Sequence, residues 1–135
     1  MRSISVLLVD DNRRFLDVLS RYLQEASEGE VRVVGTVADG REAVPRAIAA
    51  QPDVVCLDLY MPDLSGQLIL PRLRAQLPQV TIVVLTVQDQ EAVRHTTLAM
   101  GADGFVWKEH IMSDLLPTIR DLVAAKRGAQ PAVSG

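Results

Sequence analysis

The chain has 135 residues, enough for one domain with a single sizeable core, and 48% of them are hydrophobic. It carries 14 basic and 17 acidic side chains, and this acidic excess argues against nucleic acid as a direct partner of the segment. No apolar run has the length of a signal-peptide core or of a membrane span. The single cysteine, Cys56, lies inside an apolar run without a partner, which predicts a reduced core residue in a cytoplasmic protein.

Five short apolar runs alternate with five helical patterns along the chain. The runs predict strands at residues 5–10, 31–37, 53–58, 80–86 and 104–108. Caps and apolar spacing predict a helix after each strand: from Asn12 to about 28, from Gly40 to about 50, from Ser65 to about 77, from about 89 to 100, and from Ser113 to about 126. Continuous apolar strands separated by helices indicate right-handed crossovers. The fold class is therefore α/β, with a five-stranded parallel sheet between two layers of helices.

Residues 1–126 are expected to form this one domain. After Lys126 the helical periodicity is lost, and we expect residues 127–135 to be a flexible tail or the start of an interdomain linker. The basic residues of the last helix, Arg120, Lys126 and Arg127, are interpreted as a solvated face with favourable charges at the helix C-terminus.

Polar residues close four of the five predicted strands. They are Asp10 and Asp11 after the first, Asp58 after the third, Thr86 after the fourth and Lys108 after the fifth. Because the carboxyl ends of parallel strands meet at one edge of a sheet, we expect these side chains to share one crevice. Three carboxylates in one crevice repel each other unless a cation joins them, and Mg²⁺ suits such oxygen ligands best. The alternative is that each polar residue only caps the turn that follows it.

The segments that carry these residues resemble the receiver domain of two-component response regulators. They are Val-Leu-Leu-Val-Asp-Asp-Asn at 6–12, Asp-Leu-Tyr-Met-Pro at 58–62 with Gly66, Leu85-Thr86, and Phe-Val-Trp-Lys at 105–108. Their order and spacing agree with that family over residues 4 to about 126. The resemblance implies a flavodoxin-like fold with strand order 2-1-3-4-5.

The resemblance also implies a phosphorylation switch rather than a turnover enzyme. Asp58 would take a phosphoryl group from a sensor histidine kinase, and Lys108 and Thr86 would stabilise that group during transfer. The residues that would hold Mg²⁺ are Asp10, Asp11, Asp58 and, through its backbone carbonyl, Tyr60. Thr86 and Phe105 would then reorient and remodel the face formed by the fourth helix, the fifth strand and the fifth helix. An aromatic residue in a strand is otherwise a core residue, so Phe105 has both interpretations.

The ending of the fifth strand narrows the resemblance. Gly-Ala-Asp-Gly-Phe at 101–105, with Lys108 followed by Glu109, looks most like the NarL-type branch, whose members carry a C-terminal helix-turn-helix domain. This implies a bacterial transcription regulator whose receiver can form a homodimer on activation. The alternatives are a stand-alone receiver that acts by protein contact and a pseudo-receiver scaffold that takes no phosphoryl group. A small hydrolase of similar fold lacks support, because the sequence has no Gly-x-Ser-x-Gly elbow and no Gly-rich phosphate loop.

Overall fold

The structure is a computed structural model that describes residues 3–62, 64–87 and 91–129. Its strands are β1 (Ile4–Val9), β2 (Val31–Val37), β3 (Val54–Asp58), β4 (Thr81–Thr86) and β5 (Gly104–Trp107). Its α-helices are α1 (Arg13–Ala26), α2 (Ala43–Ala50), α3 (Gly66–Gln76), α4 (Glu91–Ala99) and α5 (Ile111–Ala129), with short 3₁₀ helices at Gly40–Glu42 and Lys108–His110. The strands form one parallel sheet in the order β2-β1-β3-β4-β5, which confirms the predicted fold class and strand order.

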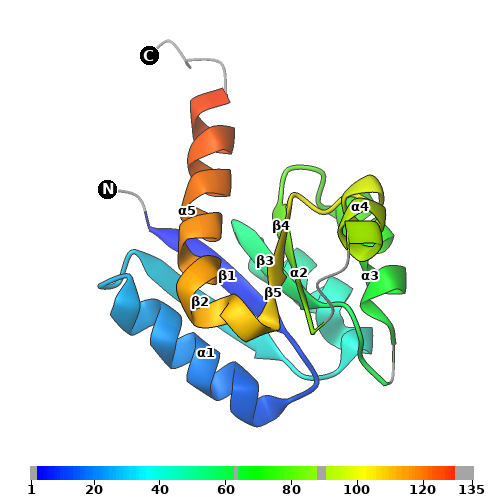
Figure 1. Ribbon diagram of the computed structural model, residues 1–135, viewed down its shortest axis with the longest axis horizontal. Helices are drawn as coiled ribbons and strands as arrows, with labels where there is room; N and C mark the ends of the chain where they lie inside the picture. Colours follow the sequence, from blue (N-terminus) through cyan, green and yellow to red (C-terminus); the bar gives the residue numbers. More distant parts are fainter. Residues whose placement is uncertain (1–2, 63, 88–90, 130–135) are drawn as a thin grey trace.

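Helices cover both faces of this sheet. Figure 1 shows α1 and α5 on one side and α2, α3 and α4 on the other. Because successive side chains of a strand point to opposite faces, each inner strand supplies both cores. In β3, Val54 and Cys56 pack with the α1 and α5 core, whereas Val55 and Leu57 pack with the α2 and α3 core. Burial raises the pKa of the Cys56 thiol to about 12, as befits a reduced core cysteine.

The predicted caps hold for α1 and α3 but not for α2 and α5. The side chain of Asn12 accepts the backbone N–H of Phe15 and caps α1, and Ser65 caps α3 in the same way through Gln67. Asp39 accepts the backbone N–H of Arg41 and caps the 3₁₀ helix Gly40–Glu42, so the helix predicted from Gly40 begins as a 3₁₀ turn and α2 starts at Ala43. The predicted cap at Ser113 is wrong, because the 3₁₀ helix at Lys108–His110 runs directly into α5 and leaves Ser113 inside the helix. The predicted start of α4 near residue 89 lies outside the described residues.

The C-terminal end of α5 also differs from the prediction. The helix continues to Ala129, three residues beyond the point where periodicity ends. Its basic residues are not simply solvated, since Arg120 pairs with Glu30, Lys126 with Asp103, and Arg127 with Asp53. Each partner lies more than 20 residues away in sequence and shortly before a strand, so these contacts hold α5 against the loops that lead into the sheet. None of the described helices combines the length and the hydropathy that a membrane span requires.

Candidate functional site

Three carboxylates meet at the carboxyl edge of the sheet, as the strand ends predict. The parallel pairing of Val9 with Leu57 brings Asp10, just after β1, beside Asp58, the last residue of β3. Asp10 and Asp58 are buried, and Asp11 is exposed at the rim. One oxygen from each of the three lies within 4.8 Å of the others. This all-oxygen set fits a hard divalent cation.

The ammonium of Lys108 lies among these carboxylates. Its Nζ donates to Oδ2 of Asp10 at 2.6 Å and lies 3.5 Å from Oδ1 of Asp58. Lys108 is the first residue of the 3₁₀ helix that follows β5, so the strand predicted at 104–108 is one residue too long. One positive charge thus faces three negative ones, and the acidic excess remains uncompensated within this group.

Burial dominates the electrostatics of Asp58. Loss of solvation raises the pKa of this carboxyl to about 6, and the negative charges of Asp10 and Asp11 act in the same direction. The positive charge of Lys108 and the hydrogen bond from the backbone N–H of Tyr60, at 3.2 Å, oppose that rise. A cation bound by the three carboxylates would lower this pKa again, because it would favour the ionised form.

Backbone packing holds Asp58 in this position. The N–H of Gly66 donates to the carbonyl of Leu59 at 3.0 Å, so the start of α3 lies directly against the end of β3. A Cβ atom at Gly66 would lie 2.3 Å from the carbonyl oxygen of Asp58 and 2.8 Å from Cα of Leu59. The glycine is therefore required by close backbone approach, a constraint that its place in a turn does not reveal.

The two predicted switch residues lie on the neighbouring strands. Asp58 pairs with Leu85, so the buried Thr86 ends β4 one residue beyond that pair. Phe105 of β5 pairs with Val84 of β4 and packs at the margin of the α2 and α3 core. Its ring lies beneath the guanidinium of Arg94, whose Cζ is 5.1 Å from the ring centroid. The structure thus gathers Asp10, Asp11, Asp58 and Lys108, with Tyr60 bonded to Asp58, and puts Phe105 on the α4 side of the sheet.

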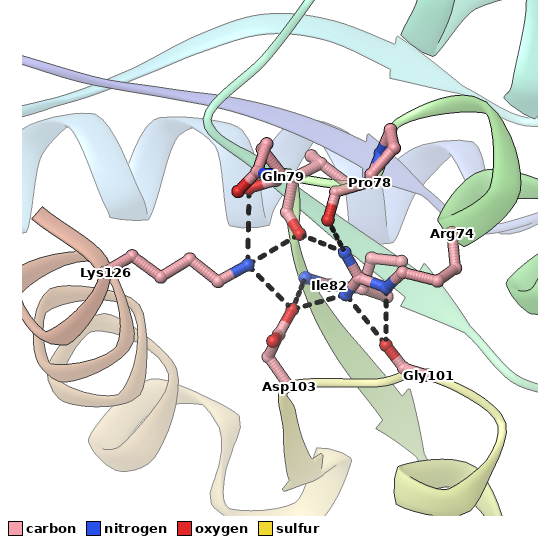
Figure 2. Close-up of polar contacts among 8 residues, drawn as sticks. Arg74, Pro78, Gln79, Ile82, Gly101, Asp103 and Lys126 are labelled. Atoms are coloured by element: carbon pink, nitrogen blue, oxygen red, sulfur yellow. Dashed lines mark hydrogen bonds and ion pairs between the residues drawn. The ribbon is translucent and has the colours of Figure 1, made fainter. Parts of the chain in front are cut away.

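Sequence reasoning missed a second polar cluster, at the opposite edge of the sheet. In Figure 2, Arg74 of α3 and Lys126 of α5 converge on Asp103, just before β5. Their donors also bind the backbone carbonyls of Pro78, Gln79, Val80 and Gly101. We call Arg74, Asp103 and Lys126 the clamp. No spacing in the sequence signals it, because its members are 29 and 23 residues apart.

Comparison with known proteins agrees with this architecture. The family model of the response regulator receiver domain matches residues 6–120 of the sequence. The chain belongs to the response regulator receiver family. Its receiver fold superimposes on the signal receiver domain of the response regulator NarL from Mycobacterium tuberculosis with a TM-score of 0.82, at 27% identity, covering 92% of this chain and 98% of that one. The chemotaxis protein CheY4 of Vibrio cholerae gives a TM-score of 0.78 at 31% identity, covering 89% and 98%.

One curated relative is longer than this receiver domain. The response regulator protein VraR of Staphylococcus epidermidis is 31% identical over 133 residues, which is 97% of this chain but 62% of the relative. The chain therefore spans less than two thirds of the length of that protein. The comparisons place the domain in two-component signal transduction, in agreement with the resemblance that the strand-end motifs carry.

Proposed function

We propose that the chain is a phosphorylation-controlled receiver whose phosphoacceptor is Asp58. The observation that carries the proposal is the buried carboxylate at the end of β3, with a lysine ammonium 3.5 Å away and two further carboxylates around it. A solvated turn cap would need none of these neighbours. A site that binds a cation would also explain why three carboxylates gather at this edge of the sheet with only one ammonium to balance them.

In the proposed reaction an oxygen of Asp58 attacks the phosphorus of a phosphohistidine on a sensor kinase. The new O–P bond forms as the P–N bond breaks, and the imidazole leaves. Lys108 would bind a phosphoryl oxygen, and the hydroxyl of Thr86 would donate to another. Mg²⁺, held by Asp10, Asp11, Asp58 and the carbonyl of Tyr60, would neutralise charge on the transferred group.

The consequence of phosphorylation is a change of surface. The phosphoryl group adds negative charge and acceptor oxygens next to the buried Thr86. Thr86 and Phe105 would reorient together, and Phe105 would lose its contact with Arg94 on α4. The face of α4, β5 and α5 would then present a new surface to a partner or to a second copy of the chain.

We further propose a bacterial, cytoplasmic transcription regulator in which this receiver controls a helix-turn-helix output domain. The support is the greater length of VraR and the resemblance of residues 101–109 to the NarL-type branch. A stand-alone receiver that acts by protein contact is the competing arrangement, and the sequence of the parent gene beyond residue 135 distinguishes the two.

Intact mass spectrometry tests the phosphoacceptor directly. The protein is incubated with Mg²⁺ and acetyl phosphate, and we expect one phosphoryl adduct. The adduct should be absent from Asp58→Asn and from a sample with excess chelator, and it should persist in Asp121→Asn, which makes the same change at an exposed position of α5. If no adduct forms and Mg²⁺ does not raise the unfolding temperature, the proposal fails and the pseudo-receiver scaffold replaces it.

A further inference from the structure

Besides the carboxylates of Asp10 and Asp58, an aromatic ring contacts the Lys108 ammonium. Nζ of Lys108 lies 4.9 Å from the ring centroid of Phe15, a residue in the first turn of α1. At this distance a cation is attracted by the negative face of the ring. Phe15 is half-buried and packs against the α1 and α5 core, so the ring is held from behind.

Hydrogen bonds tie this ring to the same carboxylate that binds the lysine. The backbone N–H of Asn12 donates to Oδ1 of Asp10 at 2.9 Å, and Oδ1 of Asn12 accepts the backbone N–H of Phe15 at 3.0 Å. Lys108 donates to the other oxygen of the same carboxylate, Oδ2 of Asp10. The helix cap therefore sets the ring and the carboxylate in one fixed relation around the ammonium.

The three neighbours of the ammonium respond differently to phosphoryl transfer. The oxygens of Asp10 and Asp58 would be drawn to a bound cation or to the phosphoryl group, and their hold on Lys108 would weaken. The ring is neutral and keeps its attraction for the ammonium in every charge state of the site. A long lysine side chain loses much rotamer freedom when it is fixed, so a contact that survives the reaction favours the productive position.

We propose that Phe15 is a positioning residue that keeps the Lys108 ammonium beside Asp58 while the charges around it change. This inference rests on the proposed function of Asp58. Phe15 acts through Lys108 and touches neither the phosphoryl group nor the carboxylate that accepts it.

The test compares four variants of the full chain. Phe15→Leu and Phe15→Met keep an apolar side chain of similar size without the aromatic face, and Phe15→Tyr keeps that face. Tyr22→Leu is the control for loss of an aromatic side chain from α1, because Tyr22 packs against the same core seven residues further along the helix, whereas the ring at Lys108 is that of Phe15. It also removes the hydrogen bond that the Tyr22 hydroxyl donates to the backbone carbonyl of Met112, so it is the more demanding of the two aromatic losses. Two variants without the ring guard against one of them failing to fold.

The first readout is the NMR signal of the Lys108 ε-methylene group, assigned by its loss in Lys108→Arg. The aromatic ring current should displace this signal in the wild type, in Phe15→Tyr and in Tyr22→Leu, and the displacement should vanish in Phe15→Leu and Phe15→Met. A signal that does not move in either variant would overturn the contact itself.

The second readout is the rate of Asp58 phosphorylation at a fixed acetyl phosphate concentration. We expect a fall of about fivefold in Phe15→Leu and Phe15→Met, which is the loss of a partly desolvated cation–π contact, and rates near the wild type in Phe15→Tyr and Tyr22→Leu. An unchanged rate in both ringless variants would overturn the positioning role while leaving the proposed function intact. A wild type that takes no phosphoryl group would overturn both, and the mass spectrum identifies that case.

Discussion

The two edges of the sheet solve opposite problems with the same kinds of side chain. At the amino edge of β4 and β5, the clamp sets two cations around one carboxylate, and Oδ2 of Asp103 accepts from Arg74, Lys126 and the backbone N–H of Ile82. At the carboxyl edge, three carboxylates surround one ammonium. In the first arrangement the donors of both cations find acceptors within the chain. The second arrangement has an excess of negative charge that a bound cation would balance.

The hydrogen-bond donors of the two clamp cations are satisfied within the chain. The guanidinium of Arg74 makes five hydrogen bonds, which is its full donor capacity, to Asp103 and to the carbonyls of Gly101, Pro78 and Val80. The ammonium of Lys126 also has three acceptors. These contacts join α3, the start of β4, the turn before β5 and the last turns of α5, so we assign the clamp a structural role.

The clamp edge contributes to the stability of this fold, whereas the carboxyl edge carries the candidate site at a cost in stability. Carboxylates that face a saturated set of donors stabilise the folded state, and carboxylates that face each other destabilise it until a cation arrives. The same chemical change, from carboxylate to amide, should therefore have opposite effects on the free energy of unfolding at the two edges.

Asp103→Asn should give the largest loss of stability. The amide can still accept from Ile82, but Arg74 and Lys126 lose their shared counter-charge and face each other unopposed. We expect the free energy of unfolding to fall by about 2–3 kcal/mol, below the full value for a deeply buried pair because both partners are partly exposed. Urea unfolding at neutral pH measures it. A stability equal to that of the wild type would mean that the clamp is an ordinary surface pair.

Asp58→Asn should change stability in the other direction by a smaller amount. The pKa of Asp58 is about 6 in the folded chain and about 3.9 in an unfolded one, so folding penalises the ionised form at neutral pH. Lys108 keeps its 2.6 Å bond to Asp10 when Asp58 is neutralised. We expect a gain of about 1–2 kcal/mol at pH 7 without metal, measured by urea unfolding in the presence of a chelator.

The pH dependence of the wild type checks the cause of that gain. Between pH 4 and 6 the Asp58 carboxyl binds more protons in the folded chain than in the unfolded chain, so the contribution of Asp58 to stability should fall as pH rises through this window. The difference between wild type and Asp58→Asn should therefore shrink as pH falls below 6. Added Mg²⁺ should raise the stability of the wild type more than that of the variant. A difference that is independent of pH would contradict burial of the charge as its cause.

Local patterns made the carboxyl edge readable in the sequence. Each strand is a short apolar run, and each polar residue follows its run directly, so the strand bounds came within one residue and the cluster of Asp10, Asp11, Asp58 and Lys108 followed from topology. The clamp depends on side chains from two helices, α3 and α5, and from the turn before β5, which only the folded chain brings together. Lys126 was for this reason interpreted as solvated. The same holds for Phe15, because no spacing in the sequence indicates that this residue of the first predicted helix contacts Lys108.

Lys126→Met should have the smallest effect of these substitutions, and it tests whether the clamp acts as a unit. Methionine keeps the apolar stem along α5 but removes an ammonium that is about one third exposed, so we expect a loss of about 0.5 kcal/mol in the wild-type background. In the Asp103→Asn background the same change removes one of two unopposed cations, and the loss should disappear or become a small gain. Urea unfolding of the two single variants and the double variant measures this coupling. Equal effects in both backgrounds would show that Lys126 is held by the carbonyls of Gln79 and Val80 alone.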